Sequence, residues 1–189
     1  MLSPKTFKNP VSRGSLKLPR ILRRFLRRDD GAAAIEFAMV AAPFLALLFA
    51  IMETALIFFA GQALETAAAD SARLVMTGQA QTKGLSQEQF KEEVCKKVHG
   101  LFDCAGGIQV DVRTYNSFSS INNTKPLDAN GNLTLSPAYS PGGPGDIVMV
   151  RLLYQWPVYV PLLGLNLADM QGGKRLIMAT SAFRNEPYQ

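Results

Sequence analysis

The sequence of 189 residues predicts an α+β protein, in which a long N-terminal transmembrane helix extends outward and is followed by a small domain of one helix on a three- to four-stranded, mainly antiparallel sheet. Three observations predict this class. An apolar run begins after residue 36, a segment with a helix-capping signal begins at residue 86, and four segments of strand-like composition follow residue 107. We therefore divide the chain into residues 1–31, 32–60, 61–78 and 85–189.

Residues 1–31 are expected to be a basic cytoplasmic leader. The first 30 residues hold nine Lys or Arg and two Asp, whereas the other 159 residues hold eleven basic and thirteen acidic side chains. Positive charge is thus confined to a segment without a folding pattern. We therefore expect no nucleic-acid-binding surface.

Residues 32–60 are expected to form one membrane span. Phe37 to Met52 are sixteen uncharged, mostly apolar residues, and the apolar pattern resumes after Glu53. As a helix, residues 32–60 would be roughly 43 Å long, against a hydrocarbon core of about 30 Å. The alternative is the buried helix of a soluble protein, which we disfavour because few soluble folds bury so long a helix that is apolar all round.

The charges that flank this run predict its orientation. Four arginines stand just before it, at positions 23, 24, 27 and 28, and a single Arg occurs in the twenty residues after it. The positive-inside rule places the N-terminus in the cytoplasm and the C-terminal domain in the periplasm. A cleaved secretory signal is the alternative, but its apolar region would be only about 7 to 15 residues long.

Two helical segments should follow the span. Residues 61–78 continue the first helix outside the membrane, with an apolar face of Leu64, Ala68, Ala72 and Val75 and a stop at Gly78. A second helix begins at Ser86, which forms a capping box with Gln89, and we expect it to end at Gly100. Its apolar side consists of Phe90, Val94, Val98 and Leu101.

Four strand-like segments follow. "IQVDVRTY" alternates from Ile108, "NLTLS" alternates more weakly from Asn132, and "DIVMVRLLYQW" and "RLIMATSAF" are longer apolar runs. The Asn130-Gly131 step suggests a turn. For "PVYVPLLGLNLADM", residues 157–170, two placements remain open: a short helix on the membrane surface, or one packed under the sheet, which we favour.

Cys95 and Cys104 are separated by eight residues across the end of the second helix. In an oxidising compartment they can form a disulfide, which we predict; two buried free thiols are the alternative. Two thiolates do not make a metal site. The chain also lacks a Gly-rich phosphate loop and an obvious catalytic set, and its only histidine, His99, is expected to be a solvated helix-end residue. We therefore expect no cofactor, no metal and no catalysis, with an anchored envelope enzyme as a remote alternative.

One motif at the start of the apolar run resembles a known family. "GAAAIEF", from Gly31 to Phe37, resembles the type IV prepilin processing motif, which is cut after Gly and has Glu as the fifth residue of the mature chain. Its Glu-Phe ending is similar to that of the Flp (tight adherence, Tad) branch. Further similarities to TadE-like pseudopilins are Pro43, "META" with Glu53, "AAADSAR" and "FRNEPY". The resemblance covers residues 31–77 well and the C-terminal strands less specifically.

The resemblance implies a role in the assembly of Flp-type pili. A prepilin peptidase would cut between Gly31 and Ala32, and Glu36 would pair with the new α-amine in the same or a neighbouring subunit. Phe37 and Glu53 would join Glu36 in assembly, although snorkelling is the favoured alternative for Glu53. The implied partners are the peptidase, other pilins or pseudopilins, the inner-membrane secretion platform and the lipid bilayer. An uncleaved, TadG-like anchored scaffold of the bacterial inner membrane is the alternative.

Overall fold

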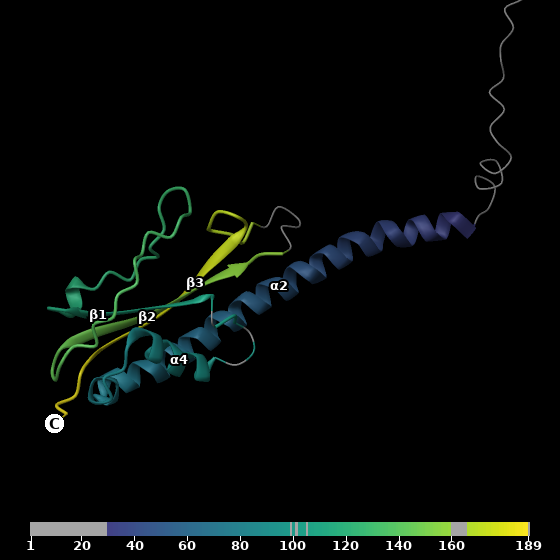
Figure 1. The fold of residues 1–189 in the computed structure, drawn as a ribbon. Coiled ribbons are helices and arrows are strands. Elements are labelled where there is room, and N and C mark those ends of the chain that lie inside the picture. Colours follow the sequence, from purple (N-terminus) through teal and green to yellow (C-terminus); the bar gives the residue numbers. More distant parts are fainter. Residues whose placement is uncertain (1–29, 99, 101, 105, 160–165, 189) are drawn as a thin grey trace, which may run out of the picture. The chain divides into compact units, whose positions relative to one another are not determined.

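The computed structural model describes residues 30–98, 100, 102–104, 106–159 and 166–188. It divides into two compact units, residues 1–44 and 45–189. The elements in chain order are helices α2 (Asp30–Met76), α3 (Gln79–Thr82) and α4 (Gln87–Lys97), strand β1 (Ile108–Tyr115), a 3-10 turn η1 (Phe118–Ser120), and strands β2 (Ile147–Pro157) and β3 (Lys174–Arg184). Figure 1 shows these elements. The predicted α+β class is confirmed. Residues 1–29 of the expected leader lie outside the described residues.

The three strands form one antiparallel sheet in the order β1-β2-β3. In its register Val112 lies opposite Val150, and Leu152 lies opposite Ala179. The predicted strand "NLTLS" is wrong: in that segment the only ladder contact is an isolated bridge between Leu133 and Leu127. The reason is local, because the carboxylate of Asp128 accepts the backbone N–H groups of residues 130 and 132 and folds the segment into a turn.

The segment between β2 and β3 contains no helix among its described residues. Residues 160–165, where part of a helix was expected, lie outside the described residues. Val158 donates its N–H to Gly173 O, and Met170 pairs with Lys174. The described ends of the connection therefore continue the hairpin between the two strands.

The end of α2 depends on Gly78, as predicted. Its φ is 75°, and a Cβ added there would lie 2.2 Å from the ring of Tyr188. Glu186 donates its N–H to Met76 O, so the segment after β3 closes the end of the helix. The one-turn helix α3 that follows Gly78 was not predicted. It buries Ala80 against the core.

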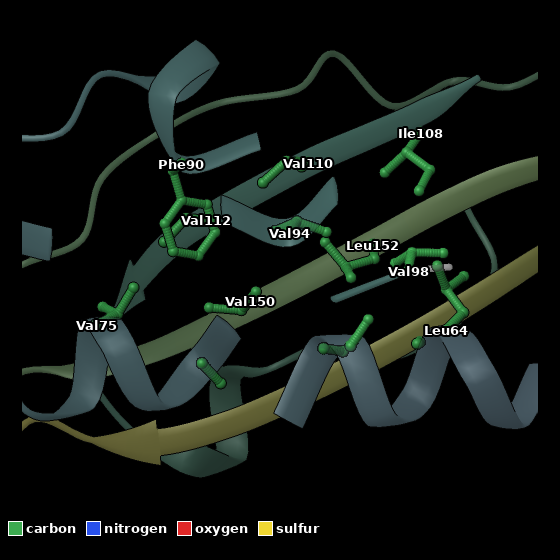
Figure 2. Packing of buried hydrophobic residues seen from close by; sticks show 14 of the residues in the cluster. Leu64, Val75, Phe90, Val94, Val98, Ile108, Val110, Val112, Val150 and Leu152 are labelled. Atoms are coloured by element: carbon green, nitrogen blue, oxygen red, sulfur yellow. The ribbon is translucent and has the colours of Figure 1, made fainter. Parts of the chain in front are cut away.

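The hydrophobic core lies between the sheet and the helices. The predicted face of α2 is buried, as are Phe90, Val94 and Val98 of the face predicted for the second helix. Leu101 of that face and His99 lie outside the described residues. Figure 2 shows the two layers meeting. The residues labelled there are Leu64, Val75, Phe90, Val94, Val98, Ile108, Val110, Val112, Val150 and Leu152.

The opposite face of the sheet is covered by the long connection between β1 and β2. Asp111 is fully buried there and accepts hydrogen bonds from Arg113 Nε and from the backbone N–H of Ala138. The buried Arg151 donates to the carbonyl of Asn122. Both faces of the sheet are therefore excluded from solvent near its centre.

The second helix begins as predicted, with a capping box between Ser86 and Gln89. It ends at Lys97, earlier than the expected Gly100, and Val98 caps it with extended backbone. A disulfide joins Cys95 to Cys104 with their Cα atoms 5.7 Å apart. Because this link brings the chain back beside Cys95 within nine residues, the helix cannot continue along its axis.

We predict that protein from its native envelope migrates differently on reducing and non-reducing gels and resists thiol labelling until it is reduced. Cys104→Ser should abolish both effects and lower the free energy of unfolding by roughly 2.5 kcal/mol, because a short closed loop is released in the unfolded chain. The exposed Ser119→Ala is the control and should change neither property. Two freely labelled thiols in the native protein would contradict the disulfide.

Candidate functional site

The candidate site consists of the motif residues on α2. Gly31 and Ala32, between which the cut is expected, both belong to the helix, and a Cβ added at Gly31 would meet no atom within 4 Å. Glu36 and Phe37 are exposed one turn further on. Glu36 makes no ion pair within the described part of the chain. Its carboxylate is thus accessible for a partner outside the chain.

The apolar residues of α2 that follow the motif are largely exposed. Large side chains are exposed on every side of the helix up to Phe49, and α2 is the one helix of the described residues that is long and apolar enough to cross a membrane. Only 6% of its most apolar stretch is buried within the protein. An exposed apolar surface of this extent needs a non-aqueous environment.

From Ala50 onward one side of α2 packs against the domain. Ala50, Ile57 and Ala60 are buried at helical spacing, and Glu53 lies in the same stripe. The other side remains apolar and exposed through Phe59. The helix therefore begins to contact its own domain while its opposite face is still as apolar as a membrane span.

Glu53 is buried within this contact, with only 6% of its surface exposed. Its carboxylate accepts the backbone N–H of Tyr159, just after β2, at 2.5 Å. Snorkelling and an inter-subunit contact were the two expectations for this residue, and neither included a bond to its own domain. No local sequence pattern could predict this hydrogen bond, because residues 53 and 159 are 106 positions apart in the sequence.

Glu36 belongs to the unit of residues 1–44 and Glu53 to the unit of residues 45–189. Among the described residues no group of three His, Cys, Asp or Glu side chains could hold a metal ion. The two carboxylates are therefore considered separately.

The described elements define a class of protein: an α+β domain carried on a long apolar helix that is suited to membrane anchoring. Residues 31–73 match the model of a family described as TadE-like protein. The match confirms the resemblance to the TadE-like family over this segment. No curated protein and no solved structure gives a significant match.

We predict that Glu53→Ala loosens the start of the β2–β3 connection. The substitution removes the acceptor of this partly buried hydrogen bond to a charged group, so the free energy of unfolding should fall by about 1–3 kcal/mol. Amide hydrogen exchange at Tyr159, measured in detergent micelles, should become faster.

Glu53→Gln keeps a carbonyl acceptor and should lose less stability than Glu53→Ala. Asp70→Ala removes an exposed carboxylate from the same helix and serves as the control. Unchanged exchange at Tyr159 in Glu53→Ala would show that this contact does not hold the connection.

Proposed function

We propose that this protein is a bitopic TadE-like pseudopilin that takes part in assembling Flp-type pili. The observation that carries the proposal is that the family match begins at Gly31, the residue after which the motif predicts the cut. The matched segment contains Glu36, Glu53 and the first buried turns of α2.

The exposed part of α2 supports a single membrane span. On the exposed side of α2, the uncharged residues from Phe37 to Phe59 rise about 33 Å as a helix, close to the roughly 30 Å of a hydrocarbon core. With the arginines before Gly31 on the cytoplasmic side, the C-terminal domain lies on the periplasmic side. There Cys95 and Cys104 meet an oxidising environment, which is consistent with their disulfide.

Cleavage gives Glu36 its role. A prepilin peptidase hydrolyses the peptide bond between Gly31 and Ala32, which releases the basic leader and leaves a charged α-amine on Ala32. One helical turn separates Ala32 from Glu36, so the amine and the carboxylate can pair within one chain or between subunits. The pairing offsets the cost of placing either charge close to lipid, and the small side chains of residues 32–34 allow a neighbouring helix to approach.

The chain then acts through contacts with other pilins or pseudopilins and with the secretion platform of the inner membrane. A TadG-like anchored scaffold that keeps its leader is the alternative. The two roles differ in whether the bond after Gly31 is cut.

We predict that co-expression with a matching prepilin peptidase yields a mature chain that begins at Ala32, as measured by N-terminal sequencing and intact mass. Gly31→Arg should block the cut. A Cβ added at position 31 meets no described atom within 4 Å, so we expect this block to reflect recognition by the peptidase, and immunoblots of membrane fractions check that the variant accumulates. The control is Gly61→Ala, a substitution in the same helix that also meets open space. An intact N-terminus in the unsubstituted chain would favour the scaffold.

We further predict that Glu36→Gln leaves a stable, membrane-inserted chain that supports few pili, because the new amine loses its counter-charge. Piliation counted by electron microscopy measures the effect, and immunoblots of membrane fractions check the amount of protein. Glu92→Gln removes an exposed carboxylate from α4 and should leave pili unchanged. Normal piliation in Glu36→Gln would show that the charge of Glu36 is not needed for assembly.

A further inference from the structure

A groove of about 360 Å³ lies between α2 and the start of β3. Ile57, Phe58 and Gly61 line it on the helix side, and Leu167, Arg175 and Leu176 line it on the other. Its walls are mostly apolar, but the guanidinium of Arg175 provides a positive charge. The groove therefore combines the two properties that a phospholipid requires of a binding site.

The groove lies where the exposed side of α2 changes from apolar to polar. From Phe37 to Phe59 this side carries no charge, because Glu53 is turned into the domain. Those residues rise about 33 Å, the thickness of a hydrocarbon core. Gln62 is the first exposed polar residue beyond them. In a bilayer, the residues around Phe58 and Gln62 would thus stand at the boundary between acyl chains and headgroups.

Tyr159 gives a second indication of the same boundary. Its backbone is bonded to Glu53, one helical turn before Ile57, while its side chain is 76% exposed. Tyrosine is enriched where membranes meet water, because its ring is apolar and its hydroxyl is polar. Val158 bonds to Gly173, so the start of β3 lies close to this point.

Arg175 supplies charge complementarity. It donates to the carbonyl of Leu167 at 3.1 Å and has no carboxylate within 4 Å among the described residues. Lys125, the other cation of the groove, pairs with Asp169, whereas Glu65 keeps its negative charge and accepts a hydrogen bond from the amide of Gln62. Arg175 is thus the cation that remains for an anionic ligand.

We propose that this groove binds one phospholipid of the periplasmic leaflet, with the phosphate at Arg175 and an acyl chain along Ile57 and Phe58. The proposal rests on the membrane span of the proposed function. Anionic phosphatidylglycerol binds more tightly than zwitterionic phosphatidylcholine, because the latter carries its own positive group beside the phosphate. The bound lipid fixes the position of the domain relative to the bilayer surface.

The chain contains its own probe for this site. Trp156 is its only tryptophan, and it lies directly opposite Arg175 in the antiparallel register. Brominated acyl chains quench tryptophan fluorescence on contact. The full-length protein, reconstituted in nanodiscs, should be quenched by brominated phosphatidylglycerol at about one fifth of the mole fraction needed for brominated phosphatidylcholine.

Two pairs of variants distinguish the effect of the Arg175 charge on lipid binding from the effect of the groove's shape. Arg175→Gln should abolish the preference for phosphatidylglycerol, whereas Arg184→Gln, the same change at the far end of β3, should keep it. Gly61→Leu fills the groove from a position where a Cβ meets nothing, and it should reduce quenching by both lipids. Ala69→Leu on an exposed face of α2 is its control. Circular dichroism checks that each variant is folded.

Equal quenching of the unsubstituted protein by both lipids, or an unchanged preference in folded Arg175→Gln, would overturn the proposal. Cross-linking between two copies that is lost in Gly61→Leu, without lipid-specific quenching, would assign the groove to a second copy and overturn it as well. Carbonate extraction of membranes from the cells that express the protein separates this failure from that of the proposed function. A chain that resists extraction without a lipid preference lacks the lipid site only, whereas an extracted chain lacks the membrane anchor.

Discussion

The fold depends on α2, a single helix that is exposed on all sides in its first part and packs against the domain core in its second part. Up to Phe49 the large side chains of α2 are exposed on all sides, but from Ala50 to Val75 one stripe of the same helix forms a wall of the domain core. Alanine makes up much of this stripe, since Ala60, Ala67, Ala68 and Ala72 are buried in the core. Between Ala50 and Phe59 both requirements apply together, one on each side of the helix. That overlap brings the domain to the edge of the apolar surface without a flexible linker.

The two carboxylates of the apolar run illustrate different solutions to one problem. A charge within such a run is costly unless it is paired or reaches water. Glu53 solves this within the chain, by accepting a backbone N–H from the segment that follows β2. Glu36 is exposed and has no ion-pair partner in the described residues. Under the proposed function its counter-charge is created by proteolysis, so the same residue type would serve the fold at one position and assembly at the other.

Local patterns in the sequence were sufficient for much of the fold. The long apolar run, the capping box at Ser86 and the composition of three strands each predicted an element that the structure contains. What could not be predicted depends on contacts between distant residues. Glu53 meets Tyr159, 106 positions away, only because β2 returns to the helix. The false strand at "NLTLS" failed for the opposite reason: Asp128, a few residues earlier, organises a local turn that outweighs weak alternation.

The contacts at the two ends of β3 have a mechanical consequence. Before β3 begins, the connection from β2 is held to α2 by the hydrogen bond between Glu53 and Tyr159. After β3 ends, Glu186 is hydrogen-bonded to Met76 of α2. The helix is thus fastened to the sheet at two points separated by 23 residues of α2, with packed side chains between them. A force pulling along the helix axis therefore loads these contacts together, in shear, instead of breaking them one at a time. Traction on the helix would be passed to the whole sheet as a single body.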